Sequence, residues 1–449
     1  MVNFRLHRLA GILIGFWLFN LSLTGFFLNH EKNNFDMGFM WSITLPSDIF
    51  NDYAISHHGH REITGYKIHP EKDWKALASM RGLFIDRGYG FKRVYTGRVF
   101  QIEPARDRDF RENFDTLYLA TDRGVIKIDW EGRYSVAGLY GKVITSISVY
   151  GDRIVAVDMK KDVYMLKDGK WEYIELPSEA DIPPDVRFGR FVRDFHYGRG
   201  LFVNPASMLI NDFASLWWLW LSVSGYIIYL MYKKLKKKKI TGIQIRRLVK
   251  LHGNIISIIL IPILFLLALT GLFIDHPRFF RPFISFSIPT AVMPPVYHEP
   301  QKDIWEVDYD GKYIRIGTRH GLYRVEDSRL VLESPGFAYR VIRVEDRLYI
   351  SGMGSPSRFY SDGRWQKIKG HVHMPVDFIK TDKGVEPVNR RKLDFRPDTL
   401  PLYTFFVTLH DGSFFHRYFI YLNDLSVILT FVLLYTGTIR YLKRRGILR

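Results

Sequence analysis

Four stretches of the chain carry almost no charge and are long enough to cross a membrane. Leu9–Leu28, Phe213–Tyr232 and Gly253–Ile274 contain no charged residue, and Tyr418–Ile439 contains one, Asp424, near its start. An apolar helix of ~20 residues spans the ~30 Å hydrocarbon core of a bilayer. The pattern therefore predicts four transmembrane helices. The first is long for a signal peptide and no small-residue cleavage site follows it, so we expect it to remain as an anchor.

The two long segments between these helices have the pattern of β-strands. Short alternating runs separated by turn residues fill most of 92–176, and the same pattern returns in 277–415. Residues 70–84 are the exception, because their apolar side chains recur at helical spacing and predict an amphipathic helix. Strand pairs joined by Asp-Gly turns are typical of propeller-like blades. Two or so blades in each segment cannot close a ring, so the two segments are expected to pack side by side.

The two halves of the chain repeat one another. The same residues recur in the same order around the helix ends of each half. The matched positions are Thr24-Gly25 with Thr270-Gly271, His30 with His276, His196 with His410, Asn211-Asp212 with Asn423-Asp424, and Ser224-Gly225 with Thr436-Gly437. This repeat predicts a pseudo-two-fold axis along the membrane normal.

The predicted fold is a membrane α-helical four-helix bundle, a tandem repeat of two helices, with two large extracytoplasmic β-rich, propeller-like insertions. Its expected parts are a lead and helix in 1–30, a first outer domain in 31–205, a helix in 206–232, a basic loop in 233–250, a helix in 251–276, a second outer domain in 277–415, a helix in 416–440 and a basic tail in 441–449.

The positive charge of the chain is concentrated beside the predicted helices. The formal net charge is +18, but 16 of the 64 basic residues lie in 1–8, 233–250 and 440–449, which contain no acid. The remaining 48 basic residues nearly balance the 46 acidic ones. The positive-inside rule then places both termini and the 233–250 loop in the cytoplasm and the long segments outside. The charge therefore indicates membrane lipid rather than nucleic acid as the partner.

Six histidines lie at repeat-related positions at the membrane edges: His7, His252, His30, His276, His196 and His410. Haem iron needs two axial ligands on opposite faces, and neutral imidazoles supply them, so a pair at each membrane face would hold two haems. The chain has no cysteine, which excludes covalent c-type attachment and leaves non-covalent haem b. The alternative for each histidine is a solvated or hydrogen-bonded membrane anchor.

The pairing of the outer histidines stays open. His7 and His30 lie ~34 Å apart along a straight helix, at ~1.5 Å per residue, which is long for direct electron transfer. His196 and His410 would shorten the route if they ligate in place of His30 and His276. Nearby arginines could bind haem propionates or lipid headgroups: Arg199, Arg278, Arg281 and Arg417.

Three smaller features are interpreted as structural rather than cofactor-binding. The Asn-Asp pairs at 211–212 and 423–424 are interpreted as helix caps, with proton-linked acids as the alternative. The repeated glycines are expected to permit close helix contact. Pro262 is expected to kink the third helix.

Leu6-His7-Arg8-Leu9-Ala10-Gly11, the Leu-Thr-Gly-x4-His ending and the later Leu409-His410-Asp411-Gly412 resemble the PepSY-associated transmembrane family. That bacterial family has large periplasmic insertions, and some members are similar to ferric-siderophore reductases with b-type haems held by membrane-edge histidines. The resemblance covers about a third of the chain and implies haem ligation by the six histidines. It does not extend to the outer segments, in which no PepSY fold is found.

The leading hypothesis is a bacterial inner-membrane haem protein that passes electrons outward and reduces a ferric chelate in the periplasm. If the chain is an enzyme, it is an oxidoreductase of this kind. No nucleotide-binding fingerprint is present, so electrons are expected from a quinol or a redox protein. The alternatives are a membrane-anchored sensor or assembly factor with a partner-binding β cap, and an accessory protein for transition-metal uptake.

Overall fold

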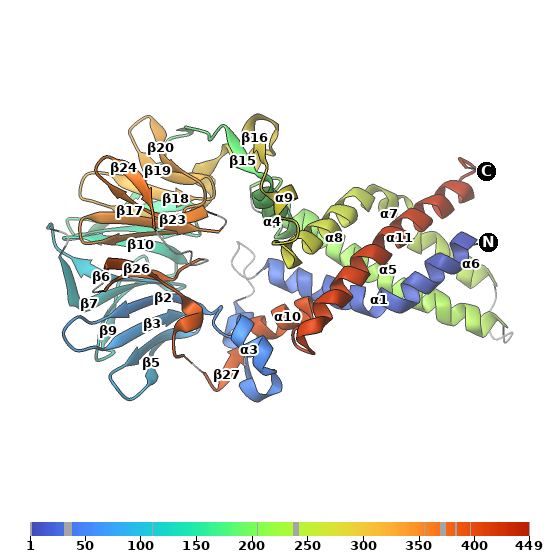
Figure 1. The fold of residues 1–449 in the computed structure, drawn as a ribbon, viewed down its shortest axis with the longest axis horizontal. Helices are drawn as coiled ribbons and strands as arrows, with labels where there is room; N and C mark the ends of the chain where they lie inside the picture. The colour runs from blue at the N-terminus through green and yellow to red at the C-terminus, as the bar shows by residue number, and fades with distance from the viewer. Residues whose placement is uncertain are drawn as a thin grey trace.

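The chain forms a β part and a helical part at opposite ends of an elongated molecule (Figure 1). The computed structural model describes residues 2–30, 38–109, 111–203, 205–236, 242–353, 355–368, 374–381, 384–395 and 397–448. Both chain termini lie at the end of the helical part that points away from the sheets (Figure 1).

Within these ranges, three helices are long and apolar enough to cross a membrane: α1 (Val2–Asn29), α5 (Ala206–Lys236) and α11 (Ile420–Arg444). They confirm three of the predicted spans. The other predicted span, Gly253–Ile274, is broken into α7 (Ile255–Ile259) and α8 (Ile261–Asp275). A further helix, α6 (Gly242–His252), precedes it in the segment predicted as the basic loop, and the chain bends by 75° between Gly242–Ile259 and Ile261–Asp275. Pro262 stands in the first turn of α8, where its missing N–H ends the preceding helix at low cost.

The predicted fold class, a membrane four-helix bundle with two β-rich, propeller-like insertions, is therefore wrong. The described chain has three candidate spans, or four if the bent pair is counted as one. It is a mixed protein of about 39% helix and 34% strand, so the β part is not an appendage of a helical fold.

In the described residues, the β part consists of six sheets, antiparallel except for one strand pair, that follow one another around a closed ring, as in a β-propeller. The innermost strands of neighbouring sheets contact each other in the order β2, β6, β10, β17, β21, β25 and back to β2. The first sheet consists of β2 (Ile63–Ile68), β3 (Lys75–Ser79), β4 (Gly82–Asp86) and β5 (Phe91–Thr96). The second consists of β6 (Val99–Arg106), β7 (Glu112–Thr121), β8 (Gly124–Asp129) and β9 (Tyr134–Gly138). The third consists of β10 (Ile144–Tyr150), β11 (Arg153–Asp158), β12 (Asp162–Lys167) and β13 (Lys170–Ile174). The other three are β17 (Ile304–Tyr309), β18 (Ile314–Thr318), β19 (Gly321–Val325) and β20 (Arg329–Pro335) with β14 (Glu179–Ala180); β21 (Arg340–Val344), β22 (Arg347–Gly352), β23 (Ser355–Ser361) and β24 (Arg364–Lys367); and β25 (Asp377–Thr381) with β26 (Gly384–Val388).

Each long segment thus contributes three sheets, and only the two together close the ring. The two segments also join through β14, which pairs in parallel with β20 of the other segment. Two short sheets, β1 (Thr44–Pro46) with β27 (Thr399–Pro401) and β15 (Asp185–Arg187) with β16 (Ser287–Pro289), connect the segments where the ring meets the helices. The short helices of this junction are α2 (Phe39–Ser42), α3 (Asp52–His58), α4 (Phe188–His196), α9 (Arg281–Ile284) and α10 (Leu402–Asp411).

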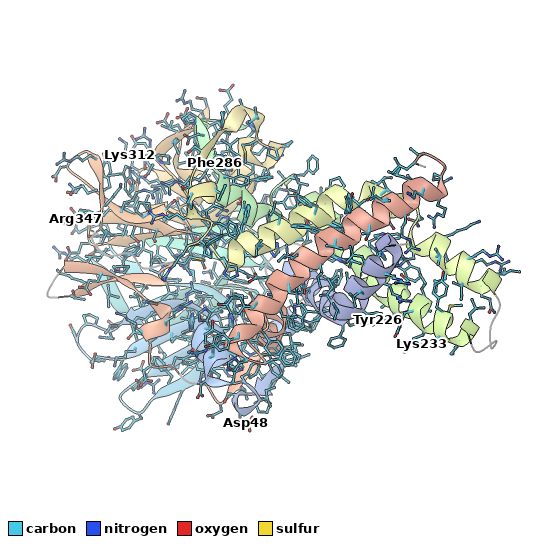
Figure 2. The ribbon with its side chains drawn as sticks, turned by 45° about the vertical axis from the view of Figure 1, so that its right-hand side comes forward. Asp48, Tyr226, Lys233, Phe286, Lys312 and Arg347 are labelled. Carbon is cyan, nitrogen blue, oxygen red and sulfur yellow. The ribbon has the colours of Figure 1, made fainter. Side chains whose placement is uncertain are left out.

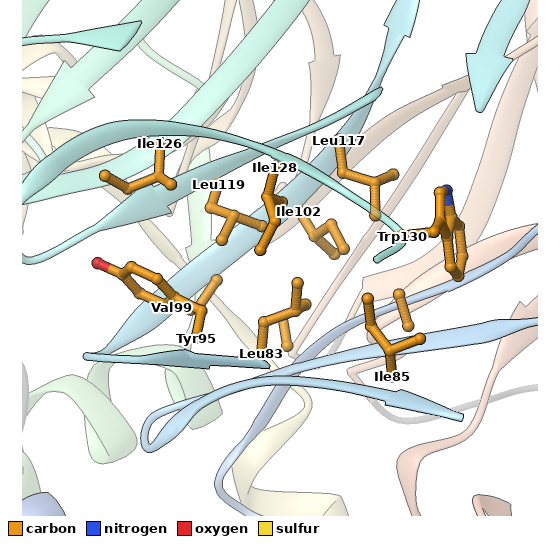
Figure 3. Close-up of a cluster of buried hydrophobic side chains, with 12 residues drawn as sticks. Leu83, Ile85, Tyr95, Val99, Ile102, Leu117, Leu119, Ile126, Ile128 and Trp130 are labelled. Carbon is orange, nitrogen blue, oxygen red and sulfur yellow. The ribbon is translucent and has the colours of Figure 1, made fainter. Parts of the chain in front are cut away.

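The amphipathic helix predicted for 70–84 is absent; the described residues there form β3 and β4 instead. Leu83 and Ile85 pack in the core between the first two sheets (Figure 3), whereas Leu77 packs on the opposite face. A strand that is buried on both faces of its sheet does not need to alternate apolar and polar residues. Its apolar residues can therefore fall by chance at the spacing of a helix.

The Asp-Gly turns are confirmed. Asp168 and Gly169 join β12 to β13 with φ of 51° and 76°, and Asp362 and Gly363 join β23 to β24 with φ of 52° and 75°. Two positive φ angles in succession are typical of type I′ hairpin turns, which Asp-Gly favours.

The centre of the ring is closed by buried ion pairs between different sheets. Arg340 and Arg343 of β21 contact Glu306 and Asp308 of β17. Lys67 of β2 similarly lies 3.0 Å from Asp377 of β25. All of these side chains are buried, so each charge depends on its partner.

A pH test follows from His320, which is buried in the turn between β18 and β19 against Tyr297. Burial, and then Arg319, lower the pKa of His320 to about 3. The unfolded imidazole binds a proton below pH ~6.5, whereas the folded one does not until pH ~3, so acid costs stability in this interval. We expect the melting temperature to fall less between pH 6.5 and 4 in His320→Asn than in the unaltered protein. Equal falls would contradict the assignment of a neutral buried imidazole.

Candidate functional site: two histidine pairs in the helical part

Four of the six predicted histidines lie in two pairs. The terminal pair, His7 of α1 and His252 of α6, has its ring centroids 6.4 Å apart at an interplanar angle of 89°. The propeller-side pair, His196 of α4 and His410 of α10, also has its centroids 6.4 Å apart, at 60°. The first pair lies near the chain termini, and the second lies where α4 and α10 meet the long helices (Figure 1).

Each of these four histidines is held by a Ser or Thr hydroxyl. Nδ1 of His7 lies 2.8 Å from Thr436 Oγ1, and Nδ1 of His252 lies 2.7 Å from Ser224 Oγ. In the propeller-side pair the distances are 3.2 Å from His196 to Thr270 and 2.8 Å from His410 to Thr24. The same contact is therefore built four times, once on each of α1, α5, α8 and α11.

The hydroxyl contact fixes the tautomer of each ring. Every one of the four hydroxyls donates its single proton to the carbonyl four residues earlier in its own helix, at 2.6–2.7 Å. The hydroxyl oxygen must then accept from the imidazole, so Nδ1 carries the proton and Nε2 carries the lone pair. Holding Nδ1–H in a hydrogen bond is how proteins orient a histidine that binds a metal through Nε2.

A glycine follows each of these hydroxyls and gives room to the same ring. A Cβ at Gly25, Gly225 or Gly437 would lie 3.4–3.7 Å from Cε1 of the neighbouring histidine, and at Gly271 only 3.2 Å from His196. Any larger side chain would enter the space beside the imidazole. The glycines thus face histidine rings, which corrects the expectation that they serve close helix contact.

The two rings of the propeller-side pair are neutral. Burial, and then the neighbouring His410, lower the pKa of His196 to about 4, and burial also lowers the pKa of His410. Neutral imidazole is the form that coordinates a metal. The arrangement can therefore offer two nitrogen ligands to one metal at each of two places.

The terminal pair lines a cavity of ≈ 350 Å³ between α1, α5, α6 and α11. Its walls are mostly apolar and include Tyr226, whose hydroxyl bonds to Ile12 O in α1; Figure 2 shows Tyr226 among the helices. Arg8 and Arg440 also line the cavity and supply positive charge at its end. The sequence alone suggested no contact of the histidines with these arginines or with the four hydroxyls, although a Ser-Gly or Thr-Gly step recurs in each long apolar run.

His30 and His276, the other two predicted histidines, are not brought together. His30 Nε2 lies 3.0 Å from Asp212, and His276 Nε2 lies 2.9 Å and 3.0 Å from the two oxygens of Asp424. A carboxylate thus occupies the nitrogen that would bind a metal. The two histidines form His-Asp pairs instead.

The Asn-Asp steps are not helix caps, which corrects that interpretation. Asn211 lies in the second turn of α5 and donates to the carbonyls of Phe195 and His196 at 3.0 Å and 3.3 Å. Asn423 donates to His410 O at 3.4 Å in the other half. Each asparagine therefore holds the end of the short helix that carries a propeller-side histidine.

Two of the four arginines suggested to bind haem propionates or lipid headgroups lie against tyrosine rings. Arg417 lies over the ring of Tyr418 at 4.7 Å, and Arg199 lies 5.9 Å from the ring of Tyr197. Arg278 and Arg281 are exposed.

A third histidine lies beside the propeller-side pair. His58 of α3 is buried and lies 2.7 Å from Asp411, which directly follows His410. Burial lowers the pKa of His58 to about 4 despite this carboxylate. The contact ties α3, at the base of the ring, to the helix that carries His410.

Residues 138–444 match the family model described as the PepSY-associated TM region. The chain belongs to this family. The match includes His196, His252, His276 and His410. It also includes the two spans α5 and α11 and the bent helix pair between them. The predicted family is therefore confirmed, whereas the further likeness to haem-containing siderophore reductases stays a prediction.

No curated protein matches the chain. Among solved structures, it is similar to the extracellular domain of a hybrid two-component system protein from B. thetaiotaomicron, with 10% identity, a TM-score of 0.32 and coverage of 68% of this chain and 27% of the other. It is also similar to an ancestral GH74 enzyme, with 9% identity, a TM-score of 0.31 and coverage of 68% and 31%. The chain thus spans less than a third of either protein, and likenesses this weak carry no conclusion about its fold or activity.

Proposed function

We propose that this protein is a b-type haem protein of the bacterial inner membrane that carries electrons across the bilayer. In this proposal the terminal pair binds one haem non-covalently through Nε2 of His7 and His252, and the propeller-side pair binds a second through His196 and His410. Both termini face the cytoplasm and the propeller faces the periplasm, where a ferric chelate accepts the electrons. The haem supplies one-electron chemistry at each site.

The observation that carries the proposal is the equal spacing of the two pairs. Two neutral imidazoles that lie this close to each other would be the two protein ligands of one haem iron. Both pairs have this separation, 6.4 Å, and both have their Nδ1 protons held by hydroxyls. The cavity beside the terminal pair is apolar with arginines at its end, which suits an apolar macrocycle with two carboxylates.

The donor set favours haem over a free transition ion. Among the residues that the structure describes, no group of three or more His, Asp or Glu side chains lies together as a metal site. Two imidazoles alone leave a free ion mostly unligated, whereas haem brings four nitrogens of its own.

The first test is the absorption spectrum of the full chain purified from haem-replete cells. We expect a Soret band and, after dithionite, the sharp bands of reduced low-spin haem b. In proteoliposomes the reduced protein should then be reoxidised by an added ferric chelate such as ferric citrate. A colourless preparation would overturn the proposal, and a haem protein that the chelate does not oxidise would overturn its acceptor.

A further inference from the structure

The two His-Asp pairs, which play no part in haem ligation, differ in exposure although the repeat relates them. The side chains of His30 and Asp212 are 6% and 9% exposed, whereas those of His276 and Asp424 are 27% and 23% exposed. Only the second pair, here called the open dyad (His276 and Asp424), can be reached from outside the protein.

The open dyad also carries a second acid that the closed pair lacks. Asp275 precedes His276, whereas the matched position before His30 is Asn29. Asp275 Oδ2 accepts a hydrogen bond from Asn423 at 3.3 Å, and the same asparagine amide donates to His410 O at 3.4 Å. The open dyad therefore adjoins the backbone of a propeller-side haem ligand.

Exposed aromatic side chains surround the open dyad. The Tyr421 ring lies parallel to that of His276, with centroids 6.4 Å apart and an angle of 19°, and Tyr418 continues the stack. Tyr421 is 61% exposed, and Phe279, just beyond His276, is 77% exposed. These residues lie where α8 ends and α11 begins, which is the end of two candidate spans, and aromatic residues are enriched at such ends in membrane proteins.

We propose that the open dyad is the site at which a membrane hydroquinone is oxidised. This rests on the haem that the proposed function gives to the propeller-side pair, and it adds an entry for electrons on the propeller side, beside the electrons that cross the bilayer from the terminal pair. A hydroquinone is a flat apolar ring that arrives through the lipid and must lose two protons as well as two electrons. The aromatic stack suits its ring, and the dyad and Asp275 are proton acceptors beside the propeller-side pair.

The side chains of this site can accept both protons that the hydroquinone must lose. His276 donates Nε2–H to Asp424, so its Nδ1 holds the lone pair that accepts the first hydroxyl proton, and Asp424 stabilises the imidazolium that results. The second hydroxyl proton goes to the carboxylate of Asp275. The hydroquinone would give its two electrons, one after the other, to the haem that His196 and His410 would hold, which would pass each on to a ferric acceptor, and it leaves as the quinone.

The closed pair provides the matched control, because Asp212 makes the same contact with His30 but is sealed from the lipid. The haem-loaded protein in nanodiscs is mixed with a short-chain benzohydroquinone or naphthohydroquinone, and haem reduction is followed by absorbance. We expect Asp424→Asn and His276→Gln to slow reduction about 100-fold, the scale of general-base catalysis, with the haem content and the dithionite spectrum unchanged. In Asp212→Asn the hydroquinone should reduce the haems at the same rate as in the unaltered protein.

A binding measurement gives a second readout that does not depend on turnover. Calorimetry with the oxidised short-chain benzoquinone should show binding that Tyr421→Leu weakens about tenfold, as expected for the loss of one stacked ring. Tyr435→Leu, at another exposed tyrosine of α11, should bind as the unaltered protein does.

The outcomes separate the two proposals. A preparation without haem overturns the proposed function and this inference with it. A haem protein that dithionite reduces but neither hydroquinone reduces overturns this inference alone, and so do equal rates in Asp424→Asn and Asp212→Asn, which would leave the open dyad as a membrane anchor.

Discussion

His410→Ala is expected to remove one of the two haems and leave the other in place. His410 supplies one axial ligand of the propeller-side site, and no other described histidine lies where it could replace it: His58 is turned to Asp411 and His276 to Asp424. His196→Ala should have the same effect, whereas His7→Ala and His252→Ala should each remove the terminal haem. Haem per chain, measured as the pyridine haemochrome, should fall by about half in each variant.

The matched controls are His30→Ala and His276→Ala, since these histidines have the same repeat relationship but contact carboxylates. Both should keep two haems per chain. The double variant His252→Ala with His410→Ala loses a ligand from each site and should contain none. Loss of haem from His30→Ala but not from His410→Ala would show that the pairing is wrong.

Arg340→Met should destabilise the propeller strongly. Arg340 is buried at the centre of the ring, contacts Glu306 of β17 and donates to Thr64 O of β2, so it joins three sheets that come from both segments. Burial already raises the pKa of Glu306 to about 7, although Arg340 opposes that rise. Removing the arginine leaves a buried carboxyl without its partner, which costs about 3–5 kcal/mol of unfolding free energy.

The double variant Arg340→Met with Glu306→Met tests this reason directly. Because it removes both charges and restores apolar volume, it should recover most of the lost stability. Denaturant unfolding followed by tryptophan fluorescence measures both variants. If the double variant is as unstable as the sum of the single ones, the loss comes from packing and not from an uncompensated charge.

The sequence predicted the elements whose causes are local. Apolar runs determined α1, α5 and α11, because a helix of that length in lipid satisfies its own backbone. The Asp168-Gly169 and Asp362-Gly363 turns were predicted because few other residues adopt two positive φ angles. The bend before α8 was suggested by Pro262, but its 75° angle, which breaks the predicted span, depends on packing.

The long-range arrangement of strands and helices could not be predicted from the sequence. Ring closure joins β2, near residue 65, to β25, near residue 380, and no local pattern links such distant strands. The pairing of the histidines could not be predicted from local pattern either. His30 and His276 share their spacing from Thr-Gly as plainly as any other matched pair, and only the position of α4 and α10 places His196 and His410 against Thr270 and Thr24 instead.

The four hydroxyl contacts could have been anticipated from sequence in part. Each long apolar run contains a Ser-Gly or Thr-Gly step, and a polar hydroxyl inside a membrane helix suggests a polar partner. The glycines were interpreted as helix contacts because a sequence does not show that a ring from another element fills the space beside them.

The most direct measurement of the central claim is low-temperature electron paramagnetic resonance of the oxidised, purified full chain, together with its haem content. Iron held between two imidazoles at both places predicts two low-spin ferric haems per chain with bis-histidine signals, and no high-spin signal. A protein that binds no haem, or one whose iron is high-spin because an imidazole is missing from one face, would contradict the account.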